Sequence, residues 1–447
     1  MHQMTKILLT APPDQLEPNN TSREGSAPPL AIYVLASILR EHGYSVRIID
    51  PVSHHVGFFD NEVRFPTLEK EINDANVVCI SSTSFSWFIA RKMIERIKSL
   101  VPDIPIIVGG IHATFLDEHV LKNSEVDYVV RGEGEKTLLE LLASIENGEG
   151  IREVLGISYK DDGKVFRNKD RPSLTIREME ETPLPAFDLM PSGLHELITV
   201  ESSRGCSFSC AFCSIVYRNL WRGIGTEIFQ KRIEHALCYG DKLTGNKGVF
   251  LVDDNFTANR SRAEEILGNL SEIDFKDADL SFQARADDLL NSDIIRYCAK
   301  IPIKAIGIGA ESGYDEAMKK VHKGIFTRDI ERCATLLRTY GLSKYAIYSF
   351  IVGFPWEGKK DCLRTIDFAY KIVSKYGGLG LINWLYFFPG SDLWNKRHLY
   401  GVEGGPEIYD SVNYRCNEFK IKSYKVKEDD IIEIENYCNL LKLLARF

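Results

Sequence analysis

The sequence predicts an α/β protein built from a doubly wound five-stranded parallel sheet followed by a partial (β/α)6 barrel. Three observations predict this fold class. Short apolar runs alternate with helical patterns over about the first 140 residues, and the alternation resumes from about Leu197 with six further runs. Small or polar residues follow most of these runs. Such alternation is typical of parallel sheets whose faces are covered by helices.

The length of the chain favours several domains. A chain of 447 residues with 44% apolar and 26% charged residues has material for more than one core. A stretch rich in proline and turn residues separates the two alternating regions. We expect a ligand-binding sheet domain over 1–150, a linker with a small hairpin over 151–190, a barrel over 191–400 and a short helical region over 401–447.

Charge and hydropathy exclude two classes of partner. A net charge of −8 argues against a general nucleic-acid binder, which normally presents a basic surface. No apolar run approaches the roughly 20 residues of a membrane-spanning helix. The opening "MHQMTKILLTAPP" is typical of a first strand rather than of a signal peptide. The ten cysteines are therefore expected to stay free or bind metal in a reducing, cytoplasmic compartment.

The first alternating region contains five expected strands and at least two helices. The helices span 30–43 and 88–101, where apolar residues recur at helical spacing. The strands lie within "KILLTAPP" (6–13), "SVRIID" (45–50), "VVCISSTS" (77–84), "PIIVGG" (105–110) and "YVVRGEGE" (128–135). Ligands of doubly wound sheets bind beyond the carboxyl ends of the strands, so the residues that end these runs are the candidates.

The second region contains six expected strands. They lie within "LITVESSRG" (197–205), "GVFLVDDNF" (248–256), "LSFQARADD" (280–288), "AIGIGAESG" (305–313), "YAIYSFIVGFP" (345–355) and "INWLYFFPG" (382–390). In barrels of this kind, functional residues gather at the carboxyl ends of the strands. The final helical pattern, "EDDIIEIENYCNLLKLLARF" (428–447), is expected to cap the barrel.

The stretch "SSRGCSFSCAFCS" places Cys206, Cys210 and Cys213 within eight residues. Three structural thiols so close together are rare by chance. A structural zinc ion normally needs four ligands, often as two separated cysteine pairs, and no second pair exists here. An iron–sulfur cluster is held by cysteine thiolates, and three protein ligands would leave one iron of a [4Fe-4S] cluster open.

The same stretch resembles the radical SAM superfamily, whose signature is C-x3-C-x-aromatic-C after the first barrel strand. "GCSFSCAFC" matches it in full. The resemblance implies a [4Fe-4S] cluster on the three cysteines, with S-adenosylmethionine on the open iron, and reductive cleavage to a 5′-deoxyadenosyl radical. It also implies the residues that bind S-adenosylmethionine: Phe212, Asp253, Asp254, Arg285, Glu311 and Gly353. Read alone, a strand-end acid is often a helix N-cap, and pairing with an acid is an equally simple role for Arg285.

The first region lacks the G-x-G-x-x-G of a nucleotide-binding unit after its first strand. It resembles instead the cobalamin-binding domain that precedes the barrel in one radical SAM subfamily, above all in "VGGIHATFLDEHVLKNSEVDYVVRGEGEKTLLELL" (108–142). The resemblance implies cobalamin contacts at Pro13, Ser81, Ser82, Thr83, Ser84, Gly109, Gly110, His112, Gly132, Glu133 and Gly134. D-x-H-x-x-G, which supplies a histidine to cobalt in many cobalamin domains, is absent, and "DPVSHHVG" lacks its spacing. We expect base-off cobalamin without a histidine ligand.

Both resemblances together favour a cobalamin-dependent radical SAM methyltransferase. The alternatives are cyclisation, ring contraction or oxidation on the same cofactors, and a non-catalytic cobalamin sensor. Methylthio transfer is disfavoured because the first region has only Cys79. The short C-terminal region favours a small-molecule substrate, with Tyr217, Trp221 and Arg222 as candidates to line its route, although such a cluster is as often plain packing. A reductant such as flavodoxin or ferredoxin is the expected protein partner.

Overall fold

The structure is a computed structural model that describes residues 4–13, 27–50, 57–59, 62–245, 247–411 and 425–442. The chain forms two compact units, and each is discontinuous in sequence. The first unit comprises Met1–Thr199, Asp241–Gly245 and Gly404–Tyr414. The second comprises Val200–Gly240, Asn246–Glu403 and Arg415–Phe447. In the described residues, no helix is long and apolar enough to cross a membrane.

The first unit is built on a seven-stranded sheet with the order β2-β1-β5-β6-β7-β8-β9. The first five strands in this order run parallel to one another, which confirms the predicted doubly wound sheet. These strands are β1 (Lys6–Thr10), β2 (Ser45–Ile49), β5 (Val77–Ser81), β6 (Ile106–Gly109) and β7 (Tyr128–Val130). They are short and mostly buried, as expected for strands covered on both faces.

The hairpin expected near residue 160 is continuous with this sheet. Strands β8 (Ile157–Asp161) and β9 (Lys164–Arg167) pair antiparallel, and β8 also pairs antiparallel with β7. Buried Arg131, just after β7, donates to the Asp170 carboxylate at 2.7 Å and to the carbonyl of Asn168, so a charge-assisted bond fastens the hairpin to the sheet. A separate two-stranded ribbon consists of β3 (Gly57–Phe59) and β4 (Glu62–Arg64).

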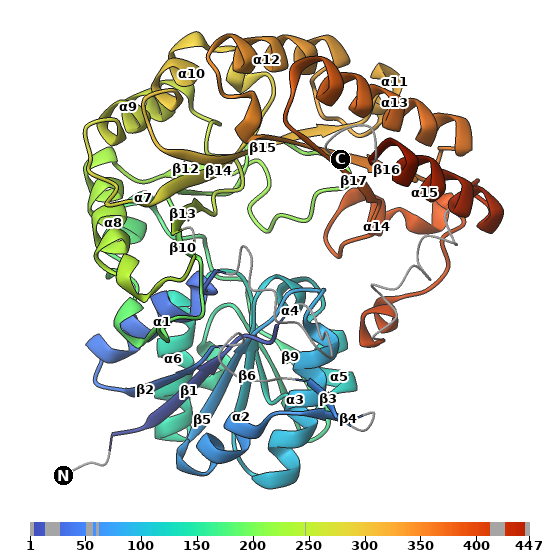
Figure 1. Cartoon of the computed structure of the whole chain (residues 1–447). Coiled ribbons are helices and arrows are strands. Elements are labelled where there is room, and N and C mark those ends of the chain that lie inside the picture. Colours follow the sequence, from blue (N-terminus) through green and yellow to red (C-terminus); the bar gives the residue numbers. More distant parts are fainter. Residues whose placement is uncertain are drawn as a thin grey trace. The chain divides into compact units, whose positions relative to one another are not determined.

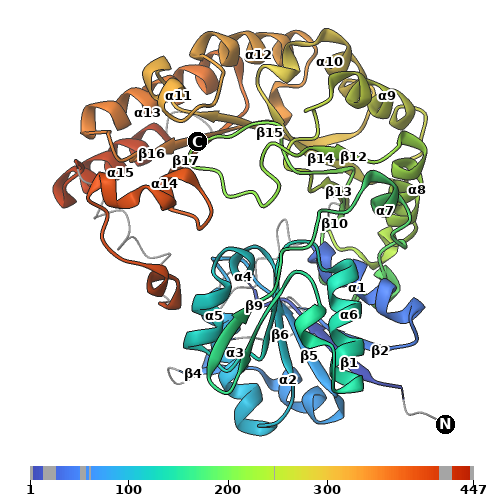
Figure 2. The same cartoon turned by 180° about the vertical axis from the view of Figure 1, so that it is seen from behind.

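Helices cover both faces of the first sheet (Figures 1 and 2). Helices α1 and α6 contact each other on one face, and α3 and α5 lie on the other. The helices of this unit are α1 (Leu30–Glu41), α2 (Pro66–Glu71), α3 (Trp87–Leu100), α4 (Ile111–Phe115), α5 (Asp117–Asn123), α6 (Gly134–Asn147) and α7 (Ile176–Glu180). The sheet's carboxyl edge is therefore formed by the turns that lead from strands into helices.

The second unit is built on a six-stranded sheet with the order β10-β13-β14-β15-β16-β17, which confirms the predicted partial barrel. Its strands are β10 (Leu197–Val200), β13 (Gly248–Leu251), β14 (Asp279–Arg285), β15 (Ile303–Glu311), β16 (Ala346–Val352) and β17 (Leu379–Trp384). The printed pairs from β13 to β17 are all parallel. The last strand begins three residues before the expected segment and ends at Trp384, so "LYFFPG" follows the strand.

Helices line the outer side of this sheet along its length (Figure 1). They are α8 (Thr226–Cys238), α9 (Arg260–Leu270), α10 (Ser292–Cys298), α11 (Asp315–Lys320), α12 (Thr327–Thr339) and α13 (Lys359–Tyr376). The short helix α14 (Asp392–Asn395) follows β17. A two-stranded ribbon of β11 (Ser203–Arg204) and β12 (Arg222–Gly223) follows β10. Short 3-10 helices are η1 (Ile72–Asp74), η2 (Ile151–Glu153), η3 (Phe187–Leu189), η4 (Gly240–Lys242), η5 (Asp288–Leu290), η6 (Ser343–Tyr345), η7 (Arg397–Tyr400) and η8 (Pro406–Asp410).

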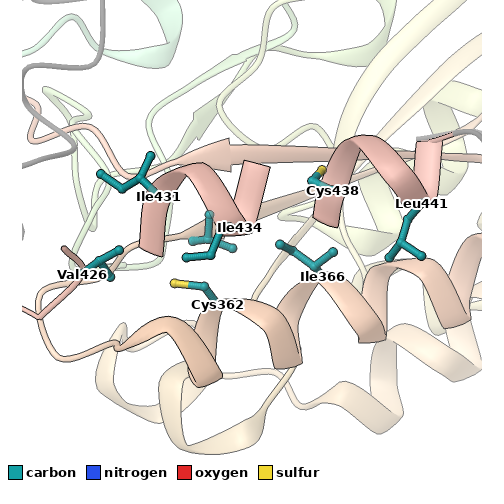
Figure 3. Close-up of a cluster of buried hydrophobic side chains, with 8 residues drawn as sticks. Cys362, Ile366, Val426, Ile431, Ile434, Cys438 and Leu441 are labelled. Carbon is teal, nitrogen blue, oxygen red and sulfur yellow. The ribbon is translucent and has the colours of Figure 1, made fainter. Parts of the chain in front are cut away.

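The last helix, α15 (Glu428–Lys442), packs along α13 (Figure 3). Ile431, Ile434 and Leu441 of α15 face Cys362 and Ile366 of α13 in one buried cluster. The contact repeats every three or four residues on both helices, as expected for two amphipathic helices that bury one stripe each. This helix therefore extends the outer helical layer of the second unit.

Candidate cofactor sites

The three cysteines lie in a loop between β11 and β12, directly after the first strand of the second sheet. Gly205 precedes the first cysteine with φ of +80°, and a Cβ atom there would lie 2.1 Å from the carbonyl oxygen of Leu220. Only glycine fits this close approach. The Cys206 amide donates to the Tyr217 carbonyl at 3.3 Å, and the Asn219 amide donates to the Cys206 carbonyl at 2.8 Å. The loop therefore doubles back on its first cysteine.

Backbone bonds from two other regions hold the same loop in place. The Ala211 amide donates to the Val321 carbonyl, and the Leu393 amide donates to the Ala211 carbonyl, both at 2.9 Å. Arg218 forms an ion pair of 2.8 Å with Asp392 at the start of α14. A loop fixed at several points can present its thiols with little loss of conformational entropy on metal binding.

The donor set fits an iron–sulfur cluster better than a single metal ion. Cys206 and Cys210 are buried, and Cys213 is half-buried. Across the described residues, no three His, Cys, Asp or Glu side chains converge on one ion position. A single zinc ion requires thiolates that meet about 2.3 Å from one point. A [4Fe-4S] cluster takes one thiolate on each of several irons, so its ligands need not converge.

Burial disfavours the thiolate forms of Cys206 and Cys213 before ligation. It raises the pKa of Cys213 to about 12 and that of Cys206 above its ordinary value. Because metal ligands bind as thiolates, loading the loop must release protons.

The two acidic residues after β13 have different environments. Asp253 is buried, and its carboxylate accepts from the Ser202 amide at 2.7 Å and from the Ser203 hydroxyl at 2.6 Å. Burial raises its pKa to about 6 against these bonds. Asp254 is exposed, and one of its oxygens accepts from the Gly205 amide at 2.9 Å. Asp253 therefore braces the start of the cysteine loop, whereas Asp254 offers its carboxylate to a ligand.

A buried ion pair stands at the end of β15. Glu311 accepts from Lys323 Nζ at 2.7 Å, and both side chains are 9% exposed. The Glu311 backbone has φ of +59° beside a register shift in the pairing with β16, an uncommon conformation for this residue type. A Cβ atom at Gly309 would lie 2.5 Å from the Glu311 carboxylate, so the glycine leaves room for the pair.

Lys323 is a site residue that the sequence analysis missed. Burial disfavours its charge, yet the nearby Glu311 carboxylate and the Cys210 thiol raise its pKa above the ordinary value. A lysine after a short helix carries no signal in sequence, since most such lysines are solvated. Its burial next to a cluster cysteine gives the cysteine loop a fixed positive charge.

Arg285 at the end of β14 also reaches the loop. Its guanidinium lies 3.7 Å from the centre of the Phe208 ring, within stacking distance. It donates to the Asp287 carboxylate at 3.0 Å and to the Lys323 carbonyl at 2.7 Å. Phe208 lies between the first two cysteines, so this contact links the third strand to the loop. Phe212 lies 6.1 Å from Phe354 beyond β16, measured between ring centres.

The turn after β16 is organised by a buried carboxylate. Glu357 accepts from the Gly353 and Phe354 amides at 2.8 and 3.0 Å and from the Tyr314 hydroxyl at 2.7 Å. Burial raises its pKa to about 6. Gly353 has φ of +82°, and its missing Cβ leaves space for the Trp384 ring at 2.8 Å. The need for glycine here thus has a structural cause.

The three residues proposed for a substrate route pack within the loop that follows the cysteines. The Arg222 guanidinium lies 4.6 Å from the centre of the Tyr217 ring. Trp221 faces Arg262 at 5.7 Å, and a Cβ atom on Gly223 would lie 2.5 Å from the Trp221 ring. Arg222 is buried. These contacts pack the residues within the loop, while the buried Trp221 Nε1 has no hydrogen-bond partner among the described residues. Their assignment to a substrate stays a prediction.

The carboxyl edge of the first sheet differs in character. Gly110, after β6, has φ of +91°, and a Cβ atom there would lie 2.4 Å from the Ser82 carbonyl oxygen. The Ser82 amide donates to the Gly109 carbonyl at 3.0 Å, and the His112 amide donates to the Ser82 carbonyl at 3.3 Å. The Ser84 hydroxyl lies 3.1 Å from His112 Nδ1. Hydrogen bonds therefore join the turns after β5 and β6 into one surface, Ser81–Ser84 with Gly109–His112, which we call the knitted edge.

This edge leaves two buried polar atoms unsatisfied. Ser82 Oγ and His112 Nε2 have no hydrogen-bond partner in the part of the chain that the structure describes. Buried polar groups are nearly always bonded, so each exception needs an explanation. A polar ligand seated on small residues would satisfy both atoms. The edge therefore fits a broad cofactor such as cobalamin, bound through hydroxyl and imidazole groups.

The remaining predicted cobalamin residues surround this edge. Thr83 Oγ1 accepts from the Ser86 amide at 3.2 Å in a local turn, and the Gly132 amide donates to Thr114 Oγ1 at 3.0 Å. Glu133 accepts from the Leu174 amide at 2.7 Å and so fastens the following segment. Pro13, Ser81 and Gly134 are half-buried. His54 and His55 of "DPVSHHVG" lie outside the described residues.

Comparison with known families matches each region separately. Residues 17–142 match the B12 binding domain, and residues 200–369 match the radical SAM superfamily. The two matches place the knitted serine–glycine edge in the first family and the cysteine loop in the second.

Individual proteins resemble both regions at once. An uncharacterized methyltransferase of Pyrococcus horikoshii is 29% identical, over 88% of this chain and 83% of its own length. An anaerobic magnesium-protoporphyrin IX monomethyl ester cyclase of Cereibacter sphaeroides is 25% identical over 82% of this chain, which spans 59% of that relative. The radical S-adenosylmethionine methyltransferase TsrM of Kitasatospora setae, solved with cobalamin and a [4Fe-4S] cluster, shares the fold with a TM-score of 0.68. In that structure TsrM is 16% identical to this chain, and the match covers 90% of this chain and 76% of the TsrM chain.

Proposed function

We propose that this chain, which matches the B12 binding domain over residues 17–142 and the radical SAM superfamily over residues 200–369, is a cobalamin-dependent radical SAM enzyme that methylates an unactivated carbon of a small molecule. When bound, the cluster with S-adenosylmethionine supplies a 5′-deoxyadenosyl radical that abstracts hydrogen, and cobalamin supplies the methyl group. The protein's own contribution is to bind, orient and shield these groups. The observation that carries the proposal is the chemistry of the two strand-end edges. The edge of the second sheet holds three thiols near charged side chains. The edge of the first sheet holds two buried polar atoms, Ser82 Oγ and His112 Nε2, without a hydrogen-bond partner among the described residues.

The charged side chains around the cysteine loop suit a zwitterionic ligand. Asp254 is the exposed carboxylate that can accept from the methionine ammonium group. Lys323 and Arg285 are the cations near the loop that favour the methionine carboxylate and the anionic cluster. Glu311 holds Lys323 in place at 2.7 Å. Asp253 supports the loop from behind through its bonds to Ser202 and Ser203.

The cobalamin edge suits a base-off cofactor without a histidine ligand. His112 is fully buried, and burial lowers its pKa to about 3. It is held by Ser84 and by stacking on Trp87 at 4.8 Å, so it lines the edge as a fixed neutral ring. EPR of the Cob(II) form should show no nitrogen superhyperfine splitting from an axial protein ligand. Such splitting would contradict the base-off assignment.

Product analysis tests the proposed reaction. The anaerobically reconstituted protein, given a low-potential reductant such as reduced flavodoxin, should release 5′-deoxyadenosine. With candidate small molecules and methylcobalamin it should give products heavier by one CH2. Absence of 5′-deoxyadenosine in the fully loaded protein would reject the enzymatic assignment and leave a cobalamin-binding protein without turnover.

A second reaction class is favoured by one relative. The cyclase of Cereibacter sphaeroides resembles this chain over both regions, and its name describes ring formation. Ring formation, ring contraction or oxidation would use the same residues and differ at the substrate. Products that lose hydrogen or keep their mass, with 5′-deoxyadenosine formed in proportion, would replace methylation by this alternative.

A further inference from the structure

A short segment far along the chain belongs to the first unit. We call Gly404–Ser411, which includes η8, the C-terminal strap; it clusters with the first unit although it follows the second sheet in sequence. The strap contacts α3, the helix after β5. The B12 binding domain match ends at residue 142 and does not include it.

Asp410 fixes the strap through three partners on two helices. Trp87 Nε1 donates to Oδ1 of Asp410 at 2.8 Å, and His119 Nε2 donates to Oδ2 at 3.0 Å. Arg91 lies 3.5 Å from the same oxygen. Burial opposes the charge, yet the bonds from His119 and Trp87 and the charges of His119 and Arg91 lower the pKa of Asp410. A carboxylate held by several donors is a strong anchor.

Tyr409, beside the anchor, packs directly on His112. Its ring is 1% exposed and meets the imidazole edge to face, with 5.5 Å between centres. Trp87 stacks on the same imidazole at 4.8 Å and 20°. The imidazole thus contacts one ring from α3 and one ring from the strap, and we call these two contacts the clamp.

The clamp leads straight to the knitted edge. His112 Nδ1 is bonded to the Ser84 hydroxyl, and the His112 amide donates to the Ser82 carbonyl. Both unsatisfied polar atoms of the edge, Ser82 Oγ and His112 Nε2, belong to residues that the clamp positions. A shift of His112 would move its Nε2 atom and disturb the backbone hydrogen bond that links it to Ser82.

We infer that the C-terminal strap completes the cobalamin site, with Tyr409 and Asp410 as positioning residues that act through Trp87 and His112. The identity of the ligand rests on the proposed function, whereas the clamp itself rests on the contacts above. Cobalamin affinity should therefore depend on a segment that lies 262 positions beyond the matched domain, counted from residue 142 to Gly404.

The test compares two aspartates that bind opposite ends of α3. Asp410→Ala removes the anchor near Trp87, at the amino end of the helix. Asp127→Ala is the matched control, because Asp127 accepts from Lys98 near the carboxyl end of α3 and from the Ile106 amide, at 2.9 and 2.8 Å. Each change removes a carboxylate that accepts hydrogen bonds from other side chains or from the backbone. Both changes should therefore lower the thermal stability of the full chain. Asp410→Asn, which keeps an acceptor for Trp87, is the conservative variant.

The measurement is the dissociation constant for hydroxocobalamin, read from absorbance, with the unfolding temperature of each variant beside it. We expect Asp410→Ala to bind about tenfold more weakly, Asp127→Ala to bind like the unaltered protein, and Asp410→Asn to recover most of the loss. Tyr409→Ala should weaken binding, and Tyr409→Phe should not.

Each outcome decides one question. Equal affinity of Asp410→Ala and Asp127→Ala at similar unfolding temperatures would overturn the positioning role. Failure of the unaltered protein to bind hydroxocobalamin would instead reject the proposed ligand. If Asp410→Ala does not fold, the Tyr409→Ala and Tyr409→Phe pair carries the test, because neither removes the anchor.

Discussion

The two strand-end edges of this protein use opposite chemistry. The edge of the second sheet gathers thiols and buried charges, among them Asp253, Glu311 and Lys323. At the edge of the first sheet, the turns after β5 and β6 present serines and glycines, and Asp410 accepts from Trp87, whose ring stacks on His112. Charges placed at the edge of the second sheet suit a small zwitterion and an anionic cluster. Small neutral groups suit a bulky cofactor that needs room and a few hydrogen bonds.

The largest effect should come from the thiols of the charged edge. Cys210→Ala should abolish the cluster and, with it, the cleavage of S-adenosylmethionine, because two thiolates cannot hold three irons. Iron content, the cluster's visible absorbance and 5′-deoxyadenosine measure the loss. Cys238→Ala, an exposed cysteine on α8, is the control and should keep all three signals. If Cys210→Ala cleaved S-adenosylmethionine at the normal level, the assignment of the three thiols to a cluster would be wrong.

The buried ion pair should give the next effect. Lys323→Met leaves the Glu311 carboxylate buried without its partner, which costs about 3–5 kcal/mol of unfolding free energy. Removing the cation should also lower the reduction potential of the cluster and weaken S-adenosylmethionine binding. Redox titration followed by EPR and a binding measurement test this. Lys323→Met with Glu311→Gln removes one charge of each sign, so it should regain stability and most of the potential. A normal reduction potential in Lys323→Met alone would show that the lysine charge plays no part in tuning the cluster.

The neutral edge should instead be sensitive to size. Gly110→Ala places a Cβ atom 2.4 Å from the Ser82 carbonyl and forces alanine into a glycine conformation, at a cost of about 1–3 kcal/mol. Cobalamin binding should weaken while S-adenosylmethionine cleavage persists. Gly148→Ala, also at positive φ but with nothing within 4 Å of its Cβ, controls for backbone strain alone. Equal cobalamin binding by both variants would argue against a close-fitting edge.

The smallest effect should be the pH dependence that Glu357 contributes to the stability of the second unit. Burial raises the pKa of Glu357 from 4.5 to about 6, so the folded state holds this proton more tightly than the unfolded chain. Stability from this group is present at low pH and falls as pH rises from about 4.5 to 6, by at most about 2 kcal/mol. Glu357→Gln should lack this dependence. Urea unfolding of both proteins between pH 4 and 7 measures the difference, and parallel curves would contradict the assigned shift.

Much of the fold could be predicted because it depends on local pattern. The five parallel strands of the first unit and the six of the second follow from runs such as "PIIVGG" and "GVFLVDD", whose burial on both faces demands continuous apolar residues. The continuity of β8 and β9 with the first sheet could not be predicted. It depends on Arg131 reaching Asp170, a contact between residues 39 positions apart.

The sequence by itself indicated the two cofactor-binding regions, because its cysteine spacing and its G-G-x-H and G-E-G-E segments resemble those of known families. Tertiary structure alone separated buried Asp253 from exposed Asp254, brought Lys323 to the cysteine loop, and joined the strap at Asp410 to Trp87, 323 positions earlier. Desolvation and hydrogen bonding decide whether a charged side chain braces a site or binds a ligand. Those terms depend on neighbours that are distant in sequence, so they are set only when the chain has folded.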